Sequence, residues 1–515
     1  MDKKRAFLNV VVSIFFYVVL LLLSFVTRRF LIQYLGINVA GLNSLYLSLI
    51  GFLSVAELGI GSAITFSMYK PILEKDIDKV AGLYNLFKKL YFFIGIIITV
   101  GGIILIPFLS YLAKDYSELK INLYTTFLLM LLSTIITYFY SAKISLINAF
   151  KENYITTSIN SISRILCQGL QITSLIIFKS FEIYLACRTI SGFVEMLFIE
   201  FFSRRTKKEI LQNKSKIDDA TKKEVSKSIK AMFMHKIGTL LVNTADNVII
   251  SAFIGVVILG KYSNYITIMS SMIGLLAMFF TPLTSVIGHM CKEATKETIS
   301  KYFNFIYMFS FAIGLLFFLG YYAIIDELVT ICFGKDLELA KLISFVITIN
   351  YFVQFLRKDV ILFRDATGTF YYDRWKPLAE GVCNVIISII FVLILPEKYN
   401  VVGVIVATII TNLFICHIVE PHILFKYEFR KSAKKYYVKN YFCIAVFVVC
   451  LFVLSMLMVV NDNVWIQLLI NGFISVGISV VVVAVMFIFG KDFRYYAFRG
   501  IKQLWYRIFK MKTIK

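Results

Sequence analysis

The chain has 515 residues, of which 59% are hydrophobic and only 17% are charged, and its formal net charge is +23. Soluble proteins carry about a quarter charged residues, so these values exclude an ordinary soluble domain and indicate a multi-pass membrane protein. In a soluble chain the positive charge would suggest a nucleic-acid ligand. Here the cations are spread over the loops between apolar segments, and nucleic acid is not an expected partner.

Apolar segments follow one another along the whole chain, each long enough to cross a hydrocarbon core of about 30 Å as a helix. Fourteen are predicted, near residues 8–30, 40–66, 90–111, 122–142, 155–178, 182–202, 231–254, 262–287, 302–324, 342–362, 378–395, 400–420, 440–460 and 464–489. The pattern therefore predicts an all-α polytopic membrane protein.

The loops between these segments predict the orientation of the chain. Most Lys and Arg residues lie in alternate loops, of which 203–230 and 426–435 are the richest, and in the tail 491–515. Because basic loops are retained in the cytoplasm, both termini are expected there. The eight cysteines form no C-x-x-C motif with a nearby histidine pair at metal-ligand spacing, so no cofactor is expected.

A weak internal repeat lies at an offset of about 219 residues. The segment LGINVAGLNSLY (35–46) aligns with IGVVILGKYSNY (254–265), which matches Gly36, Gly41, Ser44 and Tyr46 with Gly255, Gly260, Ser263 and Tyr265. Six spans per repeat predict two six-helix lobes of the same orientation, an arrangement typical of transporters. The predicted domains are an N-lobe at 1–202, a basic cytoplasmic linker at 203–230, a C-lobe at 231–425, a helix pair at 426–490 and a basic cytoplasmic tail at 491–515.

Ionisable residues inside the predicted spans are the main functional candidates, because each costs roughly 2.5–3.5 kcal/mol at the centre of a membrane helix. The cationic candidates are Arg28, Arg29, Arg164, Arg188 and Lys236. The other polar candidates are Glu57, Glu195, Asn243 and Asp246. Helical spacing places several of them on shared faces, such as Arg188 with Glu195. We expect these faces to line a wet interior or to contact one another.

Structural explanations compete with this interpretation. Arg28 and Arg29 lie near the outer end of the first span, where their side chains can reach the membrane interface. Arg164 and Arg188 can pair with a carboxylate or with backbone carbonyls, and Glu57 and Asp246 can make structural hydrogen bonds.

Three segments make the sequence resemble a known family. They are RRFLIQYLG (28–36), AELGIGSAI (56–64) with the following YKP (69–71), and ADNVIISAFIG (245–255) with YSNY (262–265). With the fourteen spans and the repeat, they are similar to the polysaccharide flippases of bacterial surface-polymer clusters. These belong to the multidrug/oligosaccharidyl-lipid/polysaccharide exporter superfamily, and the likeness is to Gram-positive members.

The resemblance implies an alternating-access carrier in the bacterial cytoplasmic membrane. Its cargo would be an undecaprenyl-pyrophosphate-linked oligosaccharide, moved from the inner to the outer leaflet through a cationic cavity. Surface-polysaccharide assembly proteins and membrane lipids are the expected partners. The chain departs from its relatives at Gln33, where an Arg is common, and Arg28 and Arg29 would replace it. The second half carries fewer cations in its predicted spans than a symmetric pyrophosphate clamp requires.

Two other functions fit the pattern less well. A small-molecule or multidrug exporter of the same superfamily would couple transport to H⁺ or Na⁺, with Glu57 or Asp246 as the ion site. A membrane polysaccharide polymerase or glycosyltransferase would need a large outer loop with catalytic motifs. The longest outer loop, around Asp326 and Glu327, is short, and the chain is not expected to be an enzyme.

Overall fold

The computed structural model describes residues 3–57, 60–116, 121–219, 221–223, 225–226, 244–280, 294–367 and 375–489, with a few isolated positions between these ranges. Within these ranges every regular element is a helix. Contacts between Cα atoms divide the chain into two compact units, residues 1–264 with 377–397, and residues 265–376 with 398–515.

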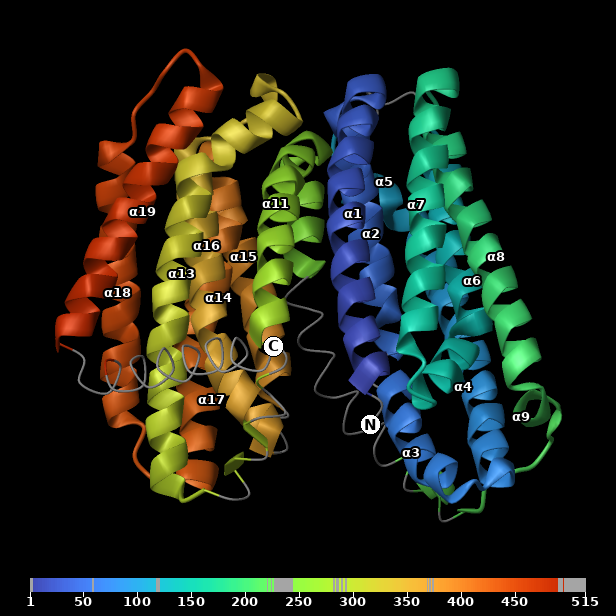
Figure 1. The fold of residues 1–515 in the computed structure, drawn as a ribbon. Coiled ribbons are helices and arrows are strands. Elements are labelled where there is room, and N and C mark those ends of the chain that lie inside the picture. Colours follow the sequence, from blue (N-terminus) through green and yellow to red (C-terminus); the bar gives the residue numbers. More distant parts are fainter. Residues whose placement is uncertain are drawn as a thin grey trace, which may run out of the picture. The chain divides into compact units, whose positions relative to one another are not determined.

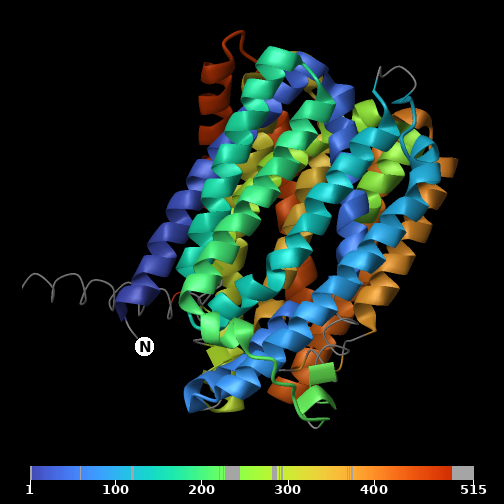
Figure 2. The same ribbon diagram turned by 90° about the vertical axis from the view of Figure 1, so that its right-hand side faces the viewer.

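The first unit is a group of long helices that pack lengthwise. Figure 1 shows α1, α7 and α8 side by side, and the turned view in Figure 2 shows the same helices running along one another. Its elements are α1 (Lys3–Leu35), α2 (Ile37–Leu53), η1 (Ser54–Glu57), α3 (Ile60–Glu74), α4 (Ile77–Leu105), η2 (Ile106–Phe108), α5 (Leu109–Leu112), α6 (Leu123–Ala149), α7 (Asn153–Phe178), α8 (Phe181–Thr206), α9 (Lys208–Gln212), η4 (Ile250–Ile254), the first part of α11 (Val256–Phe280) and most of α15 (Lys376–Ile394).

The second unit is built around α13, against which α14, α18 and α19 pack. Its centre is aromatic: the rings of Phe303 and Phe363 meet edge to face at 5.1 Å, and those of Phe352 and Phe447 stack at 3.6 Å between centroids. Its elements are α13 (Lys296–Cys332), η5 (Lys335–Leu337), α14 (Lys341–Thr367), η7 (Glu397–Tyr399), α16 (Asn400–Thr411), η8 (Asn412–Cys416), α17 (His417–Ile423), η9 (Leu424–Phe429), α18 (Lys434–Leu457) and α19 (Val464–Phe489).

The helices confirm the predicted all-α membrane architecture. Nine helices among the described residues are long and apolar enough to cross a membrane, and two shorter apolar helices lie at Ile37–Leu53 and Thr244–Ile254. The total of fourteen spans stays a prediction.

The predicted span 40–66 is wrong as a single helix. The α2 helix ends at Leu53, a 3₁₀ turn covers Ser54–Glu57, and α3 begins at Ile60. The hydroxyl of Ser54 donates to the carbonyl of Ile50 at 2.9 Å, one turn back. Glycines at 59 and 61 follow, and their low helix propensity favours the break.

The repeat places two glycines at a reciprocal helix crossing. Gly36 and Gly255 precede α2 and α11 with φ of 89° and 134°, a backbone region that glycine tolerates best. A Cβ at Gly41 would lie 1.9 Å from the carbonyl oxygen of Val256, and one at Gly260 would lie 2.5 Å from that of Ile37. Ile37 and Val256 are themselves equivalent in the repeat. Each helix therefore packs its glycine against the equivalent carbonyl of the other.

Replacing Gly41 with Ala should therefore disrupt the first unit. The added methyl group cannot fit 1.9 Å from a backbone oxygen, and forcing the helices apart should cost about 3 kcal/mol or more. Thermal unfolding of the purified protein, followed by size-exclusion chromatography, measures this loss. Gly169 is the control, because a Cβ there meets nothing within 4 Å. Equal melting temperatures for Gly41→Ala and Gly169→Ala would contradict the crossing.

Candidate functional site

Three helices of the first unit hold the predicted arginines. The α1 helix packs along α7, and α7 packs along α8. A short turn at Lys179 and Ser180 reverses the chain between α7 and α8. Lys179 has a left-handed backbone conformation with φ of 49°. The Ser180 hydroxyl accepts a hydrogen bond from the backbone amide of Ile183 at 3.3 Å. Arg28 lies seven residues before the end of α1 and Arg188 seven after the start of α8. Each is about 10 Å from its helix end.

Arg28 is held by α11. Its Nε donates to Asn264 Oδ1 at 2.5 Å, and its Nη2 donates to Ser263 Oγ at 2.5 Å and to the carbonyl of Gly260 at 3.2 Å. Three hydrogen bonds to α11 therefore fix the Arg28 side chain, which the competing explanation placed at the membrane interface. Among the described residues its Nη1 meets no acceptor. The buried Nδ2 of Asn264 also has no hydrogen-bond acceptor among the described residues.

Arg28 and Arg188 both lie within electrostatic range of Tyr184. The buried Tyr184 ring interacts electrostatically with both guanidinium groups, and Arg188 lies one turn beyond it on α8. Arg164, an exposed residue of α7, interacts with Arg188. We call Arg28, Arg164 and Arg188 the arginine cluster.

The arginine cluster is not paired with carboxylates in the described part of the chain. Over the ranges that the structure describes, none of its three arginines forms an ion pair with a carboxylate, and Arg164 and Arg188 form no hydrogen bond there. The alternative explanation for Arg164 and Arg188, pairing with a carboxylate, therefore finds no partner among the described residues. Guanidinium groups without acceptors favour an anion with several oxygen atoms.

Glu195 lies on the same face of α8 as Arg188, as its spacing predicted, but its partners are neutral. It is buried and accepts from Asn160 Nδ2 at 2.9 Å. Tyr140 of α6 lies close to both Glu195 and Arg164. Glu195 therefore borders the arginine cluster and binds α6, α7 and α8 together.

The remaining predicted residues lie elsewhere or outside the described residues. Arg29 is exposed on α1. Glu57 interacts with Tyr91 and Tyr138, of α4 and α6. Asp246 lies in the helix Thr244–Ile254, whose Asn247 donates to Ser48 Oγ of α2 at 2.9 Å. Lys236 and Asn243 fall outside the described residues.

A second group of charges, which is not part of the predicted site, lies in the second unit. The fully buried carboxylate of Glu420 is 2.6 Å from Lys376 Nζ, 2.9 Å from Arg357 Nε and 3.8 Å from Arg364 Nη1. Arg357 Nη1 also donates to Asn412 Oδ1 at 2.6 Å. We call these four charged residues the Glu420 cluster. It joins Lys376 to residues of α14, η8 and α17 within the second unit, and its net charge is positive.

The Glu420 cluster gathers three cations around one carboxylate in the second unit, and the expectation that the spans of this half are poor in cations stays a prediction. Arg357 and Arg364 are seven residues apart on α14 and so share a face, which was the one available signal. Their side chains are 17% and 4% exposed. At this burial a guanidinium needs a nearby acceptor. Glu420 provides it for Arg357, and Asp365, at 3.0 Å, provides it for Arg364.

Comparison with known proteins shows the fold. The lipid II flippase MurJ, in an inward closed conformation, matches with a TM-score of 0.63 and 15% identity over 93% of this chain and 98% of its own. An inward-facing multidrug resistance transporter of the MATE family matches with a TM-score of 0.55 and 13% identity, over 85% of this chain and 98% of its own. A variant of the Vibrio cholerae MATE transporter VcmN matches with a TM-score of 0.57 and 13% identity, over 83% of this chain and 98% of its own.

No model of a protein family and no curated protein sequence matches the chain. At identities of 13–15% the structural matches establish the fold alone. The chain has the fold of the multidrug/oligosaccharidyl-lipid/polysaccharide exporter superfamily, which its sequence resemblance predicted. It is a multi-pass membrane protein, and the Gram-positive subclass stays a prediction.

Proposed function

We propose that the chain is a flippase that moves an undecaprenyl-pyrophosphate-linked oligosaccharide from the inner to the outer leaflet of a bacterial cytoplasmic membrane, with both termini cytoplasmic. The proposal rests on one observation above all. Three arginines of the first unit, linked by electrostatic interactions through Tyr184 and between Arg164 and Arg188, have no carboxylate partner among the described residues. Three fixed positive charges of this kind match a diphosphate better than a neutral or cationic cargo.

The headgroup chemistry supports this assignment. A diphosphate cannot enter hydrocarbon without compensating charge and hydrogen bonds. Arginine is the side chain best suited to supply both, because it stays charged and its planar donors fit phosphate oxygens. The Nη1 of Arg28 and the Nδ2 of Asn264 would donate to the diphosphate, and Arg188 and Arg164 would extend the same line of charge toward the middle of the membrane. The polyprenyl chain would stay in the lipid.

The mechanism follows from the superfamily fold. Rearrangement of the helices would expose the arginine cluster first to one side of the membrane and then to the other. The cell interior is negative, so outward movement of each negative charge gains about 2.3 kcal/mol per 100 mV. The membrane potential can thus favour export, and the transported lipid leaves without being chemically changed.

A small-molecule exporter is the second candidate. Glu57, with Tyr91 and Tyr138 beside it, is a possible proton or Na⁺ site in the first unit. The arginine cluster argues against a cationic drug as cargo, because the cluster would repel it. An anionic small molecule would satisfy the same charges, and the lipid tail is what distinguishes the two cargoes.

Deletion of the gene in its native host tests the proposal. We expect lipid-linked oligosaccharide to accumulate in the inner leaflet and the surface polymer to be lost, with both restored by the intact chain. The leaflet is read from the access of an impermeant sugar-modifying enzyme to intact cells and to inverted vesicles. Increased drug sensitivity with an unchanged surface polymer would support the exporter instead.

A further inference from the structure

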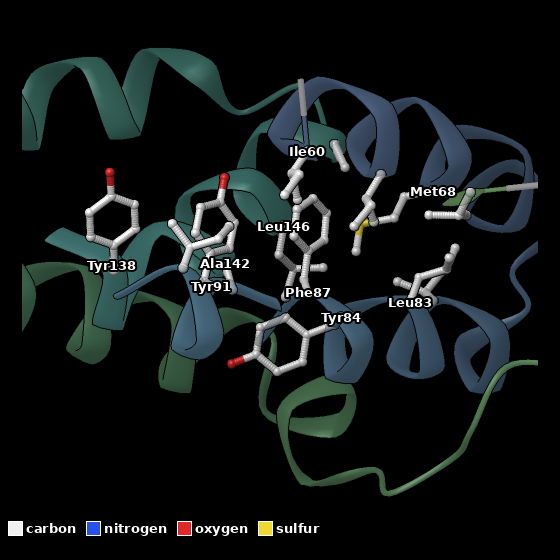
Figure 3. Packing of buried hydrophobic residues seen from close by; sticks show 14 of the residues in the cluster. Ile60, Met68, Leu83, Tyr84, Phe87, Tyr91, Tyr138, Ala142 and Leu146 are labelled. Carbon is white, nitrogen blue, oxygen red and sulfur yellow. The ribbon is translucent and has the colours of Figure 1, made fainter. Parts of the chain in front are cut away.

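A pocket of about 800 Å³ lies in the first unit between α4 and α6, apart from the arginine cluster. Tyr84 and Tyr91 of α4 and Tyr138 and Ala142 of α6 line it, and all four belong to the packed cluster of Figure 3. Lysines surround its opening: Lys88 and Lys89 on α4, Lys143 on α6, and Lys214 and Lys216 on the segment after α9.

The charges along α4 and α6 place this opening at a membrane surface. No charged residue occurs from Leu90 to Leu112, or from Leu123 to Ala142. These stretches are about 30–34 Å long as helices, the thickness of the hydrocarbon core. The stretch on α4 begins directly after Lys88 and Lys89, and the stretch on α6 ends directly before Lys143. The lysines therefore lie at headgroup depth, on the side that the basic loops assign to the cytoplasm.

The segment after α9 is fixed beside the opening. Asn85 Nδ2 donates to the carbonyls of Asn213 and Ser215 at 3.0 and 3.2 Å. Asp78 Oδ1 accepts from the side chains of Asn213 and Ser215 at 2.7 and 2.8 Å. A Cβ at Gly82 would lie 2.9 Å from Ile217 Cγ2, so the segment crosses α4 in contact with its backbone. These contacts position Lys214 and Lys216 at the pocket.

The positive charge at the opening exceeds the negative charge. Glu200 pairs with Lys143 and, at 2.5 Å, with Arg204 Nε, and Asp78 is occupied by Asn213 and Ser215. Lys88, Lys89, Lys214 and Lys216 form no ion pair with any carboxylate that the structure describes. A neighbouring pocket of about 680 Å³ shares Lys88 and Lys143 and adds Arg204, Arg205 and Lys208.

The side of the pocket toward the membrane core is apolar and open. Phe92, Phe93 and Phe139 are 58%, 60% and 61% exposed. In a membrane-spanning helix these rings face lipid. A ligand that joins a phosphate to acyl chains would place the phosphate among the lysines and the chains along these rings.

We propose that this pocket binds the headgroup of an anionic glycerophospholipid of the cytoplasmic leaflet. Basic pockets between membrane helices at this depth suit such headgroups. The chain's own tail, residues 491–515, is strongly basic and would be repelled. The bound lipid would join α4, α6 and the segment after α9. This site is independent of the proposed transport function.

Native mass spectrometry of the full chain, released from nanodiscs of phosphatidylglycerol and phosphatidylcholine, tests the proposal. We expect retained phosphatidylglycerol, and a melting temperature that rises with it but not with phosphatidylcholine. The variant K88Q/K89Q/K214Q/K216Q should lose affinity at least about tenfold, since each lysine near a headgroup contributes roughly a factor of five. The variant K88R/K89R/K214R/K216R, which keeps the four positive charges, should retain binding.

The control variant K426Q/K431Q/K434Q/K435Q removes the same charge from exposed positions of the second unit and should bind as the unchanged protein does. Equal loss in the control would show a general charge effect, and equal binding by the first variant would exclude the pocket; either result overturns the proposal. Competition by soluble glycerol phosphate at millimolar concentration would also overturn it, because it would make the ligand a free phosphate.

Discussion

Replacing Glu420 with Gln is expected to lower the free energy of unfolding by about 3–5 kcal/mol, the effect typical of removing one partner from a buried ion pair. Glu420 is fully buried, and Lys376, Arg357 and Arg364 surround its carboxylate. The neutral amide would remove the carboxylate that pairs with Lys376 and Arg357, while Arg364 would keep its closer partner Asp365, at 3.0 Å. Thermal unfolding of the protein in detergent measures the change.

The matched control for Glu420 is Glu428, eight residues further along the same helical segment. Its carboxylate is 2.5 Å from Lys296 Nζ, but that lysine is 45% exposed, and such a pair contributes about 0–1 kcal/mol. Glu428→Gln should therefore be nearly neutral. The double variant Glu420→Gln with Lys376→Met should be more stable than Glu420→Gln alone, because one cation is removed with the carboxylate. If Glu420→Gln and Glu428→Gln melt alike, the Glu420 cluster does not stabilise the unit.

Replacing Arg188 with Ala is expected to reduce transport by about ten- to a hundredfold, the effect of losing one or two hydrogen bonds to a charged group. Stability should change little, because Arg188 makes no hydrogen bond with the described residues. Arg28→Ala should reduce transport similarly but also lower stability, since it removes three contacts with α11. Complementation of a deletion strain, with the amount of protein in the membrane measured in parallel, separates the two effects.

The control for these variants is Arg29→Ala. Arg29 is adjacent to Arg28 on α1 but is exposed and lies outside the arginine cluster. It should complement fully. Arg28→Lys should complement poorly, because one ammonium group cannot replace the separate contacts of Nε and Nη2. Full complementation by Arg188→Ala at normal protein levels would remove Arg188 from the site.

The sequence predicted the helices well because span length and charge patterning are local properties. The segments near 122–142 and 155–178 correspond to α6 at Leu123–Ala149 and α7 at Asn153–Phe178. The break between α2 and α3 was missed, because the apolar pattern continues through it. The repeat register was also readable, since the same glycines return after about 219 residues. Only the structure shows why positions 41 and 260 are glycine: a Cβ atom there would lie within 2.5 Å of a backbone carbonyl oxygen of the other helix.

The site was only partly predictable. Burial cost identified Arg28 and Arg188, because charges in apolar segments are rare. The side chains that hold Arg28 are Ser263 and Asn264, more than 230 residues away, and no spacing rule connects them with it. Glu420 was visible as an intramembrane charge, but its partners Arg357 and Lys376 lie near span ends. There the sequence alone is equally consistent with ordinary cytoplasmic loop charges.

Translocation of a fluorescent polyprenyl-diphosphate sugar by the purified protein in sealed vesicles tests the central claim most directly. The claim is that the arginine cluster recognises the diphosphate. We predict that the unchanged protein and Arg29→Ala move this lipid, that Arg188→Ala moves it at least about tenfold more slowly, and that none of them moves a polyprenol-linked sugar without phosphate. Equal rates for Arg188→Ala and the unchanged protein, or equal movement of the uncharged lipid, would contradict the account.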